Sequence, residues 1–259
     1  MQDDLACVDG QIVEESRAVV PVTDLGLLRG DGIFEVCRLY DGVPYALDAH
    51  IERFMRSASG LRLEIDARAF RTDIAALIEA REQREGMVRF IATRGGRRIV
   101  LIEPLPELPP ALELEPVTYA PVRLLDGIKS LSYGANMLAS RIAREQGADE
   151  ALLVTPHGRV LECPTSSFFV VIDGVARTAS LEDHVLDSIT RRLVLAVADV
   201  REEPIERSAL EGAEEAFVAA TPYEVRPVAR VGAKRYDAPG PLTSQIAEAV
   251  AARIASELA

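Results

Sequence analysis

The chain has 259 residues, of which 48% are hydrophobic and 27% are charged, as in a globular protein with one large or two modest domains. Its net charge of −12 disfavours a nucleic-acid-binding surface, which would be basic, and disfavours docking on anionic lipid. The acidic N-terminal segment MQDDLACVDG lacks the basic and apolar regions of a signal peptide, and no apolar run reaches membrane-spanning length.

The cysteines and histidines do not suggest a metal site. Cys7, Cys37 and Cys163 lack the spacing of a disulfide framework or of a zinc site. The three histidines are far apart in the sequence and show no metal-binding pairing. We therefore expect no metal and a reducing, cytoplasmic location.

The first third of the chain alternates hairpin and helix patterns. Asp-Gly turns between apolar runs, in CVDGQIV and CRLYDGVPYAL, predict two hairpins. Apolar spacing predicts helices over Leu47–Ser59 and Ala67–Gln83. Strands are expected at Val88–Thr93 and Ile99–Ile102, joined by the RGGRR turn. Strands with segregated helices predict an α+β domain, which we place at residues 1–118.

A second domain is expected beyond a proline-rich stretch, EPLPELPPALELEP, which reads as a loop or an edge segment. Residues 119–126 then form the predicted linker, and residues 127–259 the second domain. Hairpins are expected around a Pro-His-Gly turn and an Asp-Gly turn. The helices expected there are Ala135–Gln146, Ile189–Val200 and Leu242–Leu258.

Lysine is rare in this chain, which makes its position informative. Among 29 Lys and Arg residues the only lysines are Lys129 and Lys234. Arginine stays protonated, whereas lysine can lose its proton and act as a nucleophile or form an imine. An imine-forming lysine is useful beside pyridoxal phosphate, whose ring is an electron sink. The plain alternative for Lys129 is a solvated surface side chain.

Two further features would complete such a site. Glu162, at the end of a predicted hairpin, would keep the pyridine nitrogen protonated; the alternative is an exposed acid at a strand end. The segment from Asp187 to Arg191 precedes a helical pattern, so free N–H groups and the helix dipole would bind a phosphate there. Its alternative is ordinary N-capping by Ser188.

Five segments in order carry a family resemblance. They are GDGIFEV, AHIERFMRSA, Lys129 with GADEALLVTPHGRVLE, LDSITRR and AFVAATPYEVRPV. Together they resemble the class IV pyridoxal-phosphate-dependent aminotransferases, a group that includes D-amino-acid and branched-chain aminotransferases and aminodeoxychorismate lyase. The resemblance implies an α/β (α+β) fold of type IV, with a small N-terminal α/β sandwich domain and a larger C-terminal α/β pseudo-barrel domain. It also implies a homodimer.

The resemblance assigns roles to individual residues. Lys129 matches the catalytic lysine, which forms the Schiff base with pyridoxal 5′-phosphate and moves the substrate proton. Glu162 matches the partner of the pyridine nitrogen. Leu186 matches the residue packed on the ring, and Tyr133 a residue near the ring hydroxyl. The phosphate ligands that the resemblance implies are Arg53, Ile189, Thr190 and Thr221.

The chain departs from the family pattern after Glu162. The family usually has a small residue there and, three positions on, an asparagine before an aromatic pair. This chain reads CPTSSFF over residues 163–169, so Pro164 removes a backbone donor and Ser167 replaces the asparagine. Ser166 and Ser167 remain candidate cofactor contacts.

The substrate carboxylate is expected to meet an arginine, whose planar fork makes two bonds with a carboxylate. The turn ATRGGRR offers Arg94, Arg97 and Arg98, of which we select Arg97; the alternative is a charged turn in solvent. Phe34 of GDGIFEV is a second candidate substrate contact. D-amino-acid aminotransferases place a histidine after the arginine of a similar turn, whereas this chain has Ile99.

The sequence therefore predicts a transaminase acting between a small amino acid, of the D-amino-acid or branched-chain type, and a 2-oxo acid. The alternative is aminodeoxychorismate lyase, which eliminates pyruvate. The lyase tends to have threonines after GDG and the aromatic residue, where this chain has Glu35 and Val36. A third hypothesis is a binding protein on the same fold without turnover, which retention of Lys129 and Glu162 disfavours.

Overall fold

A computed structural model describes residues 4–259 of the chain, which divide into two compact units. The N-terminal segment MQDDLACVDG, in which we expect no signal peptide, starts with residues 1–3, and these three lie outside the described residues. Unit 1 is the chain up to Pro106 together with Ile128–Tyr133. Unit 2 is Glu107–Gly127 with Gly134–Ala259. Within the described residues, no helix combines the length and apolar character needed to cross a membrane.

This division differs from the expected boundaries at residues 118 and 127. Residues 112–118 form a strand that pairs with two strands of unit 2, so they group with that unit. Ser130 forms an isolated bridge with Ile33, and the Phe34 N–H donates to the Lys129 carbonyl at 3.0 Å, so Ile128–Tyr133 groups with unit 1.

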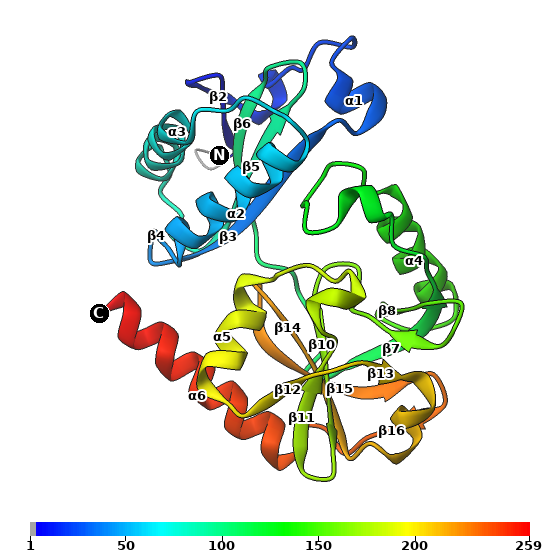
Figure 1. Ribbon diagram of the computed structural model, residues 1–259. Helices are drawn as coiled ribbons and strands as arrows, with labels where there is room; N and C mark the ends of the chain where they lie inside the picture. The colour runs from blue at the N-terminus through cyan, green and yellow to red at the C-terminus, as the bar shows by residue number, and fades with distance from the viewer. Residues whose placement is uncertain (1–3) are drawn as a thin grey trace. The chain divides into compact units, whose positions relative to one another are not determined.

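Unit 1 is built on a six-stranded antiparallel sheet in the order β2-β1-β6-β5-β3-β4 (Figure 1). Both predicted Asp-Gly hairpins are present, as the β1–β2 and β3–β4 pairs. The strands are β1 (Leu5–Val8), β2 (Gln11–Glu14), β3 (Gly32–Tyr40), β4 (Val43–Pro44), β5 (Gly86–Thr93) and β6 (Arg98–Glu103). The helical segments are η1 (Glu15–Arg17), α1 (Leu25–Arg29), α2 (Leu47–Gly60) and α3 (Ala67–Ala80).

Helices α2 and α3 pack on the sheet of unit 1. Each has an apolar face at helical spacing, and both predicted helices are present within three residues of their expected ends. Phe54 of α2, Phe70 of α3 and Phe90 of β5 form an aromatic cluster with ring centroids 4.9 to 6.1 Å apart, in which Phe54 meets the other two rings edge to face. This cluster is the centre of the unit 1 core.

Unit 2 contains a ten-stranded mixed sheet in the order β12-β11-β10-β14-β15-β7-β8-β9-β13, with β16 paired to β15. Its helical segments are η2 (Arg123–Leu125), α4 (Gly134–Glu145), η3 (Leu181–Asp183), α5 (Ile189–Val197), η4 (Arg207–Gly212) and α6 (Pro241–Leu258). Its strands are β7 (Leu112–Thr118), β8 (Glu150–Val154), β9 (Arg159–Val160), β10 (Ser167–Ile172), β11 (Val175–Thr178), β12 (Val200–Glu202), β13 (Ile205–Glu206), β14 (Glu215–Ala220), β15 (Glu224–Val231) and β16 (Lys234–Arg235).

The proline-rich stretch EPLPELPPALELEP ends in a strand of the unit 2 sheet. Its last part is β7, which pairs in parallel with both β15 and β8 and so lies inside the sheet rather than at an edge. Pro116 stands opposite Leu152 of β8 in this strand. The expectation of a loop or an edge segment is therefore wrong for residues 112–116.

Candidate active site

Strand β3 places one carboxylate inside the apolar core of unit 1. Side chains of a strand alternate between two faces, so Ile33, Glu35 and Cys37 share one face. Glu35 stands opposite Phe90 of β5 and is fully buried. Since a buried charge is costly unless it is paired, Glu35 requires partners from the helix that covers this face.

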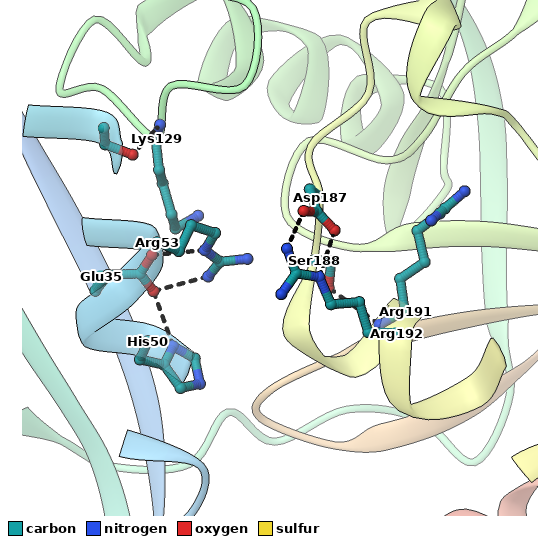
Figure 2. A network of polar contacts seen from close by, with 9 residues as sticks. Glu35, His50, Arg53, Lys129, Asp187, Ser188, Arg191 and Arg192 are labelled. Atoms are coloured by element: carbon teal, nitrogen blue, oxygen red, sulfur yellow. Dashed lines mark hydrogen bonds and ion pairs between the residues drawn. The ribbon is translucent and has the colours of Figure 1, made fainter. Parts of the chain in front are cut away.

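Helix α2 supplies those partners through a polar stripe on its buried face. His50, Arg53 and Ser57 follow one another at spacings of three and four residues, so they lie along one side of the helix. Arg53 donates from Nε and Nη2 to the two carboxylate oxygens of Glu35, at 2.6 and 2.7 Å. The Nδ1 atom of His50 lies 2.8 Å from Oε2 of Glu35 (Figure 2).

The charge states of this cluster follow from its geometry. Burial alone would raise the pKa of Glu35, but the charge and hydrogen bonds of Arg53, with a further bond from His50, lower it to about 2. Burial lowers the pKa of His50, although its bond to Glu35 opposes the shift. An ionised carboxylate only accepts, so neutral His50 carries its proton on Nδ1 and donates it to Glu35.

The segment carrying Lys129 is fixed to β3 and to α2. The Phe34 N–H donates to the Lys129 carbonyl, and the Leu131 N–H donates to the Gly32 carbonyl at 2.8 Å. The Lys129 N–H itself donates to Oγ of Ser57, at 3.1 Å. Both flanks of the lysine backbone are therefore hydrogen-bonded within unit 1, and its position depends on local packing.

Two aromatic rings lie beside the lysine side chain. Nζ of Lys129 lies 4.3 Å from the ring centroid of Phe34 and 5.7 Å from that of Tyr133. The two rings meet edge to face, with centroids 5.4 Å apart. The structure thus brings together three of the residues selected from the sequence.

The arginines of the predicted substrate turn all pair with acids. Arg97 forms an ion pair with Asp9 of the β1–β2 turn, with Nη1 and Oδ2 2.5 Å apart. Arg94 pairs with Asp31 and also donates to the carbonyls of Leu61 and Arg62. Arg98 pairs with the buried carboxylate of Asp73. In this structure the Arg97 guanidinium is therefore held by Asp9.

In unit 2, Glu162 and Leu186 are joined directly. The Leu186 N–H donates to Oε1 of the half-buried Glu162 at 3.0 Å, across 24 residues of sequence. Tyr119 lies just beyond β7. Burial, and then the charge of Glu162, raise the pKa of its phenol. The sequence reading did not select Tyr119, and nothing in its local pattern marks it.

Helix α5 begins at Ile189, three residues beyond Leu186. Ser188 caps the helix by accepting from the Arg191 N–H at 3.3 Å, as the capping alternative predicted. The N–H groups of Ile189 and Thr190 have no carbonyl one helical turn back, because the helix starts there. Asp187 accepts two hydrogen bonds from the guanidinium of Arg192 (Figure 2).

The remaining selected residues lie at strand ends of unit 2. Ser166 and Ser167 are buried at the start of β10, and Thr221 is half-buried just after β14. Oγ of Ser167 has no hydrogen-bond partner among residues 4–259. A buried hydroxyl without a partner is costly, so a bound group that pairs with it would be favoured.

Comparison with known proteins decides the family. The model of the amino-transferase class IV family matches residues 32–231. A provisionally named branched-chain-amino-acid aminotransferase of Methanocaldococcus jannaschii is 33% identical, over 85% of each chain. The chain belongs to the class IV aminotransferases. The D-alanine aminotransferase of Bacillus licheniformis is 30% identical to this aminotransferase, over 97% of each chain.

A solved structure extends the likeness to the fold of this aminotransferase. The branched-chain aminotransferase of Thermoproteus uzoniensis superposes with a TM-score of 0.90 and 27% identity, over 96% of this chain and 94% of that one. The mixed α/β architecture with two sheets therefore agrees with the expected fold type IV.

Class IV aminotransferases use pyridoxal 5′-phosphate, and the residues of this aminotransferase fit that group. Unit 1 offers the amine of Lys129 and the buried guanidinium of Arg53. Unit 2 offers the carboxylate of Glu162 and the donors at the start of α5. An amine, a carboxylate and anion-binding donors are the chemistry that an aldehyde, a pyridine nitrogen and a phosphate require.

Sequence reasoning missed two residues of the buried cluster around Arg53. Glu35 entered only as a point against the lyase, and His50 only as an unlikely metal ligand. A signal was present, because a lone acid interrupts the apolar run IFEVC while His50, Arg53 and Ser57 recur at helical spacing. Both patterns predict buried polar groups that need partners.

Proposed function

We propose that this aminotransferase moves an amino group between a small amino acid, of the D-amino-acid or branched-chain type, and a 2-oxo acid. The substrate class comes from the relatives, whose names are divided between D-alanine and branched-chain amino acids. The observation that carries the proposal is the placement of Lys129. Its backbone is bonded to β3 and to Ser57, and its amine lies beside the ring of Phe34.

The proposed division of labour follows the chemistry of each side chain. Pyridoxal phosphate, when bound, supplies a ring that withdraws electrons from Cα of the amino acid. The amine of Lys129 takes the proton from Cα and returns it to C4′ of the cofactor. Glu162 keeps a proton on the pyridine nitrogen, and its bond from the Leu186 N–H fixes its orientation.

Other residues hold and orient the reactants. The phosphate is bound by Arg53, by the N–H groups of Ile189 and Thr190, and by the hydroxyl of Thr221. Leu186 packs against the ring. The further cofactor contacts that we propose are Tyr133, Ser166 and Ser167. Phe34 contacts the substrate side chain.

Arg97 is the proposed ligand of the substrate carboxylate. Since its guanidinium is paired with Asp9, binding would require exchange of one carboxylate for another. The exposed fraction of the Arg97 side chain is 35%, so substrate can reach it from solvent. Arg94 and Arg98 are less suitable, because Arg94 also holds two backbone carbonyls and Arg98 pairs with the buried Asp73.

The surroundings of the reaction are also proposed. Three cysteines, all free and buried, support a reducing cytoplasm as the location. A homodimer is supported by exposed apolar side chains in one short segment of unit 1. Their exposed fractions are 74% for Val19, 78% for Val22 and 63% for Leu27. Contiguous apolar patches on a folded surface mark interaction sites, and we propose that this segment forms one.

The test is the visible absorption of the purified protein with pyridoxal phosphate, before and after single amino donors are added. The donors are D-alanine, D-glutamate, L-leucine and L-glutamate. A yellow form bleached by one of them would establish transamination and its substrate class. A yellow form bleached by none would instead favour aminodeoxychorismate lyase, which pyruvate release from aminodeoxychorismate would detect.

The two lysines provide a matched pair of variants for the same assay. Lys129→Ala is expected to abolish the yellow form and to lower turnover by at least about 10³-fold. Lys234→Ala should leave both unchanged, because Lys234 is on β16, donates to the backbone carbonyl of Glu211 and lies beside the ring of Tyr236, none of which belongs to the proposed site. Full activity of the Lys129→Ala protein would overturn the proposal.

A further inference from the structure

Arg53 reaches its position through a buried carboxylate that the proposed chemistry does not use. Its side chain is 5% exposed and two of its three guanidinium nitrogens donate to Glu35. Figure 2 shows the third nitrogen on the side of the guanidinium turned away from Glu35. A guanidinium bound through Nε and Nη2 is fixed in its plane, because two parallel bonds to one carboxylate remove its rotation.

Glu35 is in turn held on both of its oxygens. Oε1 accepts from Arg53, and Oε2 accepts from Arg53 and from Nδ1 of His50. The backbone of Glu35 lies in the middle of β3, paired with Phe90 of β5. The carboxylate therefore has a fixed backbone, a second donor and no exposed surface, and it cannot move aside for another ligand of Arg53.

The cluster lies in the same structural unit as the lysine. Strand β3 bonds the Lys129 segment through Phe34, the residue that precedes Glu35. Helix α2 bonds the Lys129 N–H through Ser57, one turn beyond Arg53. The same strand and the same helix thus set the positions of the amine and of the guanidinium.

We propose that Glu35 is a positioning residue for the cofactor phosphate, and that His50 supports it. Glu35 fixes the plane of the Arg53 guanidinium, so that its third nitrogen is already oriented for a phosphate before the cofactor binds. His50 holds the second oxygen of Glu35 and so prevents the carboxylate from turning. This inference rests on the proposed role of Arg53 in phosphate binding.

Substitution of Glu35 by glutamine removes the charge and one acceptor with little change in volume. The amide NH₂ of the variant would face donors of Arg53 or His50, so at least one of the present bonds is lost. A purely structural role predicts lower stability alone. A positioning role predicts, in addition, a loss confined to ligands that carry the phosphate.

The experiment compares two ligands that differ only in the phosphate, pyridoxamine 5′-phosphate and pyridoxamine. Each is titrated into the apoprotein by calorimetry, so the readout is affinity and not activity. For Glu35→Gln we expect affinity for pyridoxamine 5′-phosphate to fall about tenfold or more, and affinity for pyridoxamine to change less than about twofold. The ratio of the two affinities is the measured quantity.

Asp73→Asn is the matched control. It also removes a buried carboxylate that pairs with an arginine of unit 1, but that arginine is Arg98 and not Arg53. We expect this variant to leave the affinity ratio at the wild-type value. An unchanged ratio in Glu35→Gln, or an equal fall in both variants, would overturn the role of Glu35.

A second pair of variants decides the matter if Glu35→Gln does not fold. His50→Asn keeps an N–H donor near Glu35 and should keep most of the affinity ratio, whereas His50→Leu removes the donor and should lower the ratio. Equal ratios in both would contradict the proposal. If the wild-type protein binds neither ligand, the proposed function itself fails, and the role of Glu35 fails with it.

Discussion

Glu35 and His50 bind fewer protons in the folded protein than in the unfolded chain. The pKa of Glu35 is lowered from 4.5 to about 2, so between these values the unfolded chain is protonated and the folded protein is not. The pKa of His50 is lowered from 6.5 by burial, which has the same sign. Stability therefore rises with pH across both windows and falls on acidification, first below about 6.5 and then between about 4.5 and 2.

This sign makes a prediction about acid sensitivity. The His50→Asn variant should lack the loss of folding stability that begins below about pH 6.5. The stability of this variant should therefore change less than that of the wild type between pH 7 and 5. The largest possible difference in slope is about 1.4 kcal/mol per pH unit, for one proton. The measurement is hydrogen exchange of α2 and β3 amides in the apoprotein at a series of pH values.

The control for this experiment is His157→Asn, because His157 is exposed in the turn before β9. It should follow the wild-type curve. Parallel curves for the His50→Asn and wild-type proteins would contradict the prediction. Lys129 and Arg53 also act on His50 through their charges, so both must be retained in the variants.

Single residues were predictable where their chemistry is unusual. Lys129 was noticeable because lysine is rare in this chain, and Glu162 because it follows a hairpin beyond the next helix. The roles assigned to them, and to Arg53, Ile189, Thr190 and Thr221, remain predictions. The pairing of Glu35 with Arg53 was not predicted, because it depends on which face of β3 meets which face of α2. That register is a tertiary property.

At the scale of elements, most helices were predicted, whereas strands β7, β12 and β13 were not. Helices α2 to α6 have a clear apolar period and differ from their expected bounds by one to three residues. Strand β7 follows four prolines between residues 104 and 110 and contains Pro116 itself, so its local composition argues against a central strand. Pairing with β8 and β15 overrides that composition.

The last helix depends on one carboxylate from a strand. Glu215, the first residue of β14, accepts from the N–H groups of Leu242 and Thr243 at 3.0 and 2.8 Å, and so caps α6 across the fold. Glu215→Gln leaves one oxygen for two donors. We expect a loss of about 1 to 3 kcal/mol in the free energy of unfolding of unit 2.

Urea unfolding followed by circular dichroism would measure this loss. Glu248→Gln is the control, because Glu248 lies on the exposed side of α6. Cofactor binding by the folded Glu215→Gln protein should stay at the wild-type level. Identical unfolding midpoints for the two variants would show that the strand-to-helix bonds contribute nothing.

At the scale of the whole molecule, the proposed homodimer can be tested on its exposed apolar segment. Leu27 of α1 is 63% exposed, and Leu28 beside it is 50% exposed. Leu27→Asp would place a charge in a buried contact if this segment is an interface, so we expect the dissociation constant to rise about 100-fold or more.

Sedimentation velocity over a range of protein concentrations would measure the change. Leu181→Asp, at an exposed position of unit 2, is the control and should sediment as the wild type does. A wild-type protein that is monomeric at all concentrations would refute the homodimer. A dimer unaffected by Leu27→Asp would place the interface elsewhere.

The path of the chain between the two units bears on how such enzymes can be recombined. The chain enters unit 2 at Glu107, returns to unit 1 for the six residues Ile128–Tyr133, and enters unit 2 again at Gly134. In the sequence, Lys129 therefore lies between two segments of unit 2, whereas in the structure it belongs to unit 1. A chimera joined at a single crossover near residue 106 would take its lysine from one parent and the strand that anchors it from the other, so compatible parents must match at the Phe34–Lys129 bond as well as at the junction.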